Sequence, residues 1–193
     1  MTNGAAPSVP LQFKATATGT STVALTWTAT ANATGYDIYR SSLNSPFAFL
    51  LTAATNSATD SGLSANTTYL YKIRAVDGAG SSAFSAIDLA TTIVFTDGNP
   101  FGVRIKAIHF TEMRTAVNAV RAAAGLAAFA FTDPALNSST KIKSLHLTEL
   151  RAKLDDARFL IGVPAVSYYE PTITPGSTTV KAIHITDVRD GTQ

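Results

Sequence analysis

Residues 60–77 read DSGLSANTTYLYKIRAVD, and this stretch decides the fold of the first half of the chain. It opens on the turn-forming residues 60–62 and continues into a run in which every second residue, from Tyr69 to Ala75, is aromatic or aliphatic. Such period-2 alternation is typical of a half-buried β-strand. We therefore predict a turn over residues 60–62, followed by a strand that buries one face.

The same alternation occurs earlier in the chain. Val23, Leu25 and Trp27 alternate with threonines, and residues 36–40 alternate in the same way. Segments rich in glycine and asparagine, such as residues 31–35, separate the runs. Short strands divided by regular turn signals indicate an all-β sandwich.

The order and spacing of these segments resemble those of a known family. Residues 25–27 (LTW) and 35–40 (GYDIYR) resemble strands B and C of a fibronectin type III domain. Residues 60–77 resemble the E–F corner and strand F of that domain, and residues 80–85 resemble its last turn and strand G. The resemblance covers about residues 7–93.

This resemblance implies roles for three core residues. Trp27 would be the central core aromatic, and Leu63 and Tyr69 would form a tyrosine corner in which the phenol bonds back to the chain. Most members of the family are spacers or adhesion modules. The sequence has no Arg-Gly-Asp tripeptide, so integrin-type adhesion is not predicted.

The second half of the chain repeats itself. One pattern occurs at residues 105–114 (IKAIHFTEMR), 142–151 (IKSLHLTELR) and 180–189 (VKAIHITDVR). A marker precedes each copy: Phe95-Thr96-Asp97, Phe131-Thr132-Asp133 and the weaker Tyr168-Tyr169-Glu170. A fixed period in this range indicates units that stack on one another.

The charges also change near residue 94, since residues 1–94 hold four basic and four acidic side chains and residues 95–193 hold eleven and nine. We therefore predict two domains. Residues 1–94 form a fibronectin type III-like (immunoglobulin-like) β-sandwich. Residues 95–193 form a small, mainly α-helical domain of three repeats of ~37 residues, the third truncated.

Each repeat is expected to be an extended lead-in followed by a helix. The apolar residues of the first two repeats follow a 3-4 spacing that places one stripe on each helix. Thr111 and Thr148 are the expected N-caps, with Glu112 and Glu149 in the positively polarised first turn. Glycines at positions 125 and 162 are expected to end these two helices.

The third repeat ends soon after Arg189, so its helix is expected to have about two turns at most. Three interpretations stay open. The natural chain was cut here, or the short piece caps the array, or Ile183, Ile185 and Val188 dock on a neighbouring molecule.

The candidate binding residues are the charged and imidazole side chains of the repeated pattern: Lys106, His109, Glu112, Arg114, Lys143, His146, Glu149, Arg151, Lys181, His184, Asp187 and Arg189. Equivalent residues of stacked helices lie ~8–10 Å apart, too far to share a metal ion, so no metal site is predicted. Each histidine is instead expected to bond backbone at the start of its helix. Glu–Arg pairs are expected between repeats, because residues two apart on a helix do not face each other. A charged surface with one period also fits a repeating polymer such as a glycan.

Several classes of function are not predicted. The chain has no cysteine, a net charge of only +2 and no long apolar run. These properties argue against disulfides, nucleic-acid binding and membrane insertion. No nucleophile elbow, phosphate loop or His-Glu-x-x-His motif is present, so no catalytic residue and no cofactor is predicted.

The His-x-x-Glu-Leu-Arg-type repeats resemble short repeats of bacterial surface proteins, a family without a firm biochemical assignment. We predict a non-catalytic, extracellular structural or adhesive module of a bacterial surface protein, with a protein or a cell-surface glycan as partner. Two alternatives are a self-assembling subunit, forming a homo-oligomer or filament completed by the third repeat, and a carbohydrate-binding appendage of a larger secreted enzyme. The first residues lack a basic-then-apolar signal segment, so the chain is expected to be a mature fragment with an added start codon.

Overall fold

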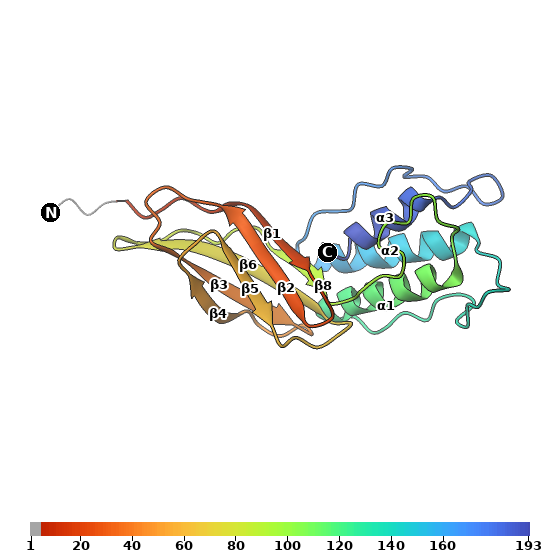
Figure 1. Ribbon diagram of the computed structural model, residues 1–193, viewed down its shortest axis with the longest axis horizontal. Helices are drawn as coiled ribbons and strands as arrows, with labels where there is room; N and C mark the ends of the chain where they lie inside the picture. Colours follow the sequence, from red (N-terminus) through yellow and green to blue (C-terminus); the bar gives the residue numbers. More distant parts are fainter. Residues whose placement is uncertain (1–4) are drawn as a thin grey trace.

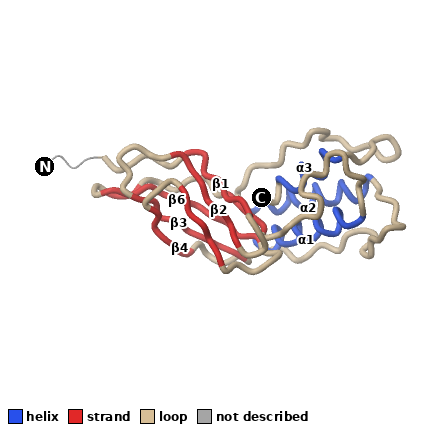
Figure 2. The backbone as a smooth tube through the Cα atoms, viewed as in Figure 1, coloured by secondary structure: helices blue, strands red, loops and turns tan. Residues whose placement is uncertain are grey.

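The computed structural model describes residues 5–193. The molecule is elongated, with a β-sandwich at one end and a helical region at the other (Figure 1). Coloured by secondary structure, the two halves separate clearly along the long axis (Figure 2). The fold class predicted from the sequence, a sandwich followed by a small helical region, is confirmed.

Eight strands build two antiparallel sheets. They are β1 (Leu11–Ala17), β2 (Thr22–Thr28), β3 (Gly35–Ser42), β4 (Ala48–Ala53), β5 (Ser57–Ser61), β6 (Thr68–Asp77), β7 (Gly80–Ser81) and β8 (Asp88–Thr91). One sheet has the order β1-β2-β5, and the other has the order β4-β3-β6-β7, with β8 also pairing with β6. The sheets pack face to face, as the alternation of apolar residues requires.

The core of the sandwich follows the residues that the alternation singled out. Leu25 is fully buried and Trp27 is 4% exposed, with its ring centroid 5.1 Å from that of Tyr36. The backbone N–H of Ser64 donates to the Tyr69 hydroxyl at 3.0 Å, so the predicted tyrosine corner is present. A single β-sandwich core thus contains Trp27, Tyr36, Tyr69 and Tyr71, with Phe13 packed against it.

The predicted turn at residues 60–62 is only partly correct. Asp60 and Ser61 belong to strand β5, which pairs with β2, and only Gly62 has the left-handed φ of 73° that a turn needs. Asp60 is buried. Its carboxylate forms an ion pair with Arg40 at 2.9 Å and accepts a hydrogen bond from the Tyr71 hydroxyl at 2.9 Å. Burial raises the pKa of Tyr71, because the ionised phenol would lose its hydration, and the neighbouring Asp60 carboxylate raises it further.

Three helices follow: α1 (Ala107–Ala123), α2 (Ser144–Leu160) and α3 (Ala182–Asp190). The N-caps are Lys106, Lys143 and Lys181, so α1 and α2 begin five residues before the positions expected from the sequence. The prediction of Thr111 and Thr148 as N-caps was wrong. Their glutamate neighbours consequently lie beyond the first turn.

The ends of α1 and α2 were predicted correctly. Gly125 and Gly162 have φ angles of 75° and 73°, the left-handed conformation typical of the residue after a helix. A Cβ on Gly125 would lie 2.6 Å from the Asn44 amide of the sandwich, so the end of α1 abuts the β3–β4 loop. None of the helices within residues 5–193 is long and apolar enough to cross a membrane.

The helices and the sandwich share one apolar cluster. Leu70 of β6 and Leu89 of β8 belong to the same buried cluster as Phe110 of α1. The backbone N–H of Thr91 also donates to the carbonyl of Thr192, just after α3, at 3.1 Å. The outer face of β6 is therefore covered by helices at this point, which explains why Leu70 is buried.

All three helices run in the same direction. The colours of Figure 1 place the starts of α1 and α2 farthest from the sandwich and their ends beside it. The contact between Thr91 and Thr192 places the end of α3 beside the sandwich as well. The three helix N-termini therefore gather at the far end of the molecule.

Candidate functional site

Each histidine of the repeated pattern joins the start of its helix to its own lead-in. The backbone N–H groups of Lys106, Lys143 and Lys181 donate to the Nδ1 atoms of His109, His146 and His184 at 3.4, 3.3 and 3.2 Å. Because Nδ1 accepts, the ring proton is on Nε2, which donates to Asp97 (3.0 Å), Asp133 (3.0 Å) and Glu170 (2.9 Å) respectively. The expected contact between histidine and backbone is present, and all three rings are fully buried.

Each arginine of the pattern reaches the lead-in of a different segment. Arg114 donates to the carbonyls of Thr132 (2.6 Å) and Asp133 (2.9 Å), and Arg151 donates to the carbonyl of Glu170. Arg189 donates to the carbonyls of Thr96 (2.9 Å) and Asp97 (2.8 Å), ninety or more residues earlier in the chain. We call these contacts the arginine latches. They run from the first segment to the second, from the second to the third, and from the third back to the first.

The aromatic residue of each marker packs against the arginine that binds the same lead-in. The guanidinium carbons of Arg114, Arg151 and Arg189 lie 5.2, 4.2 and 4.5 Å from the ring centroids of Phe131, Tyr168 and Phe95. Cation–π contacts of this length stabilise a desolvated guanidinium. The arginine of the repeated pattern in one segment therefore contacts the aromatic marker residue of another segment.

The acidic residues of the pattern also bind the lead-ins, by accepting hydrogen bonds from their backbone N–H groups. Glu112 accepts from the backbone N–H of Thr96 at 3.0 Å and lies 3.6 Å from Arg189. Asp187 accepts from the backbone N–H of Tyr169 at 3.0 Å and lies 3.4 Å from Arg151. The pairing of acidic and basic residues between repeats, expected from their spacing, is present at these two positions.

The candidate binding residues differ in how far they are exposed, and the acidic residues are half-buried. The histidines are fully buried and the arginines are 5–7% exposed. The lysines are different, because the side chains of Lys106, Lys143 and Lys181 are 49%, 54% and 50% exposed. No group of three potential metal ligands occurs within residues 5–193.

The lysines still interact with the lead-ins. Lys106 and Lys143 lie 2.8 Å from Asp97 and Asp133, and Lys181 pairs with Glu170. Hydrogen bonds from Lys106 and then His109 lower the pKa of Asp97, and Lys143 and His146 lower that of Asp133 in the same way. The pKa of Glu170 is lowered first by its hydrogen bond from Lys181.

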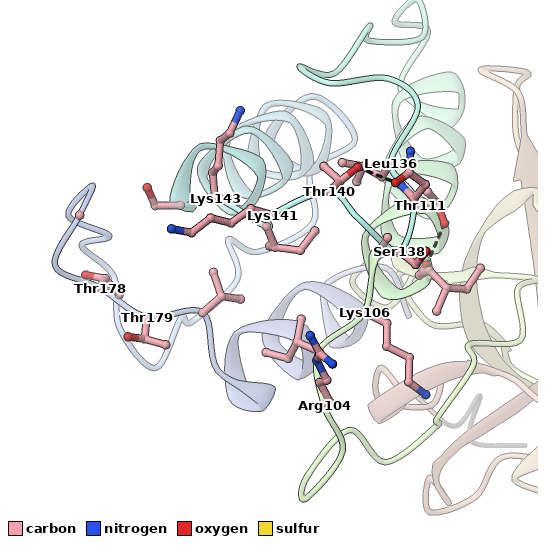
Figure 3. Close-up of a pocket in the computed structure, with 18 of the residues that line it drawn as sticks. Arg104, Lys106, Thr111, Leu136, Ser138, Thr140, Lys141, Lys143, Thr178 and Thr179 are labelled. Atoms are coloured by element: carbon pink, nitrogen blue, oxygen red, sulfur yellow. Dashed lines mark hydrogen bonds between the residues drawn. The ribbon is translucent and has the colours of Figure 1, made fainter.

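A hollow of about 1190 Å³ lies at the helix N-termini, and we call it the distal hollow (Figure 3). It is formed by residues 104–108, 136–138, 140–144 and 176–180 together with Thr111. Three equivalent positions of the repeats line it with Arg104, Lys141 and Thr179. In Figure 3, Lys141 extends toward the loop that carries Thr178 and Thr179.

Arg104 and Lys141 were not among the predicted site residues. They lie two positions before Lys106 and Lys143, so a comparison of the repeats extended by one residue toward the N-terminus aligns them. The missing information was spatial. Only the parallel packing of the helices brings their lead-ins around one opening.

Fold and site together define a β-sandwich module with three appended parallel helices and a hollow at the far end. Residues 5–87 match the family model of the Fibronectin type III domain, and the sandwich has that fold. The resemblance found in the sequence of the first half is confirmed.

Several curated proteins are similar to part of the chain. The "Alpha-amylase" of Niallia circulans is 43% identical over 91 residues, which are 45% of this chain and 7% of that protein. The "Exoglucanase B" of Cellulomonas fimi is 33% identical over 118 residues, 60% of this chain and 10% of that protein. The "Chitinase A1" of Niallia circulans is 36% identical over 97 residues, 48% of this chain and 13% of that protein. The chain thus spans a small part of the length of each relative.

One solved structure, "Structure of FN3tt mut", is 30% identical to this chain. The match covers 46% of this chain and 98% of that structure, with a TM-score of 0.43.

Proposed function

We propose that this chain is a non-catalytic, extracellular accessory module of a larger bacterial polymer-acting protein and that it binds a glycan. The names of the relatives support the setting, because an amylase, an exoglucanase and a chitinase act on polysaccharides. The observation that carries the proposal is the distal hollow, an open site at the end of the molecule farthest from the sandwich. The shared apolar cluster fixes this site relative to the sandwich, which acts as its spacer.

We further propose that residues 95–193 act as one unit built from three repeats, the third of them shortened. Recurrence of the histidine contacts and the arginine latches at equivalent positions supports this division. In this proposal the buried histidines and arginines and the half-buried acidic residues of the pattern position the lysines. Lys106 and Lys143 then present their cations at the edge of the distal hollow.

The test is a binding assay with the whole chain and insoluble starch, cellulose and chitin. Depletion of the protein from the supernatant by at least one polymer, or a signal on a glycan array, is the expected result. An unrelated acidic protein of similar size serves as the control for non-specific adsorption. A chain that binds none of these polymers and no arrayed glycan contradicts the proposal, and measurable hydrolysis of any of them contradicts its non-catalytic part.

Self-association is the second candidate function, and the exposed end of α2 favours it. Phe159 is 83% exposed and Leu160 is 57% exposed. The third helix is a weaker basis, because Ile185 and Val188 are already fully buried against α1 and α2 in the same chain. Light scattering at several protein concentrations tests this function. A concentration-dependent increase in mass that Phe159→Ser abolishes supports it, and a strictly monomeric protein excludes it.

A further inference from the structure

We infer that the distal hollow is a binding site for an acidic glycan, a chain whose sugars carry carboxylate or phosphate groups. This inference rests on the proposed glycan-binding function and adds the place and the charge of the ligand. None of the relatives' names indicates an acidic polymer. The argument comes from the charges, the shape and the chemistry of the hollow.

The cations of the hollow are the first observation. Arg104, Lys106, Lys141 and Lys143 line it, and no Asp or Glu is among its lining residues within the described chain. The ammonium groups of Lys106 and Lys143 are already paired with Asp97 and Asp133, which lie outside the lining. Their contribution to the field of the hollow is therefore partly neutralised.

Arg104 and Lys141 differ from this pair. Both side chains are exposed, and within residues 5–193 neither takes part in a hydrogen bond or an ion pair. Two cations at the rim of one concave surface whose lining residues include no carboxylate create a positive potential that attracts anions. A bound carboxylate or phosphate supplies the missing negative charge.

The polar character of the hollow fits a sugar chain. Its wall carries hydroxyl groups from Ser138, Ser144, Ser177 and Thr179, which donate and accept hydrogen bonds. Ile105 and Ile142 also line the hollow and pack on the apolar core, so they are held in place. Sugars present both hydroxyl groups and C–H faces, and a wall of this mixed kind complements both.

The size of the hollow favours a polymer over a small anion. About 1190 Å³ exceeds the ~300–1,000 Å³ of a typical small-molecule pocket. Arg104 and Lys141 come from two different lead-ins, so a ligand must extend across the opening to contact both. A chain with a charged group on successive sugars satisfies both cations at once. A guanidinium also binds a carboxylate or phosphate through two parallel charge-assisted hydrogen bonds, whereas a neutral sugar offers no charged acceptor.

The experiment measures the affinity of the whole chain for three soluble polymers by isothermal titration calorimetry. Polygalacturonate supplies carboxylates, a poly(glycerol phosphate) supplies phosphates, and soluble starch is neutral. The expected result is binding to at least one acidic polymer that weakens as salt rises from 50 to 500 mM. The double substitution Arg104→Ala with Lys141→Ala is expected to weaken this binding roughly tenfold or more, since it removes two ionic contacts.

A matched control removes two cations from the sandwich, with Lys14→Ala and Lys72→Ala. These residues lie on strands β1 and β6, so the control changes the net charge equally and leaves the distal hollow intact. Its affinity for the acidic polymer is expected to stay within about twofold of the unsubstituted chain. Circular dichroism of both double variants checks that the helices remain folded.

The possible outcomes separate this inference from the proposed function. Binding to starch, cellulose or chitin without binding to either acidic polymer leaves the glycan-binding function intact and overturns the inference. Acidic-polymer binding that the two double variants weaken equally, or that the Arg104/Lys141 variant leaves unchanged, also overturns it. Absence of binding to every polymer overturns both. The two acidic arms decide between carboxylate and phosphate as the recognised group.

Discussion

Buried charged groups have different structural roles in the sandwich and in the helical region. In the sandwich, one cluster of Arg40, Asp60 and Tyr71 lies beside the aromatic core that packs between the two sheets. In the helical region, a buried arginine recurs at each of three equivalent positions, and each one binds a different segment. Apolar packing thus determines the first architecture, whereas the second needs its polar contacts to set the order of the segments.

The largest effect is expected from the aromatic core of the sandwich. Trp27→Ala should lower the free energy of unfolding by about 3–5 kcal/mol, because it removes a large buried ring and leaves a cavity. Phe110→Ala, the corresponding truncation in the helical region, should cost a similar amount. Urea denaturation followed by circular dichroism measures both. A loss below about 1 kcal/mol for Trp27→Ala would contradict the dominance of apolar packing in the sandwich.

The junction tests whether the two regions unfold together. Leu89 is fully buried in the cluster that contains Phe110, so Leu89→Ala should cost about 2–5 kcal/mol. The expected result is a single unfolding transition for the whole chain, displaced for strand and helix signals alike. Amide hydrogen exchange resolves the two regions separately. Loss of protection in the sandwich alone would show that the regions are energetically independent.

The arginine latches provide a comparison within the helical region. Replacement by methionine keeps much of the side-chain volume and removes the charged hydrogen bonds, each worth about 1.5–3 kcal/mol. Arg114→Met, Arg151→Met and Arg189→Met should therefore destabilise the chain by similar amounts. Thermal and urea unfolding of the three variants measures this. A much smaller effect for Arg189→Met would mean that the third segment is not tied to the first.

The smallest effect concerns acid. The folded-state pKa values of Asp97 and Asp133 lie below their usual value of 3.8, so these groups stabilise the fold above that pH. Their contribution is lost as the pH falls through the lowered pKa values, where the folded state must also take up protons. We expect a drop in melting temperature below about pH 4. Asp97→Asn with Asp133→Asn should make this drop shallower, and an unchanged profile would assign acid unfolding to other carboxylates.

The sequence predicted the sandwich better than the helical region, for a physical reason. Alternation along a strand depends on neighbouring residues alone, so Leu25, Trp27 and Tyr69 could be assigned to the buried faces of their strands without knowledge of the fold. The helix starts were misplaced because threonine is a common N-cap, whereas here a histidine three residues into the helix accepts the N-cap N–H.

The sequence likewise predicted only some features of the candidate site. The spacing of Glu112 and Arg114 correctly indicated contacts between segments, since two such residues cannot face each other on one helix. It could not show that these side chains point inward. Arg104 and Lys141 became candidates only when the parallel helices placed their lead-ins around one hollow.

The arginine latches also limit how this architecture can change in length. In an open solenoid, each repeat contacts only its neighbours, so a further copy can be added at the end of the stack. Here Arg189 occupies the carbonyls of Thr96 and Asp97, which any additional segment would need for its own arginine. A fourth copy would have to displace that contact before it could insert. The contacts of Arg189 therefore close the three segments into a ring and distinguish this region from an open stack.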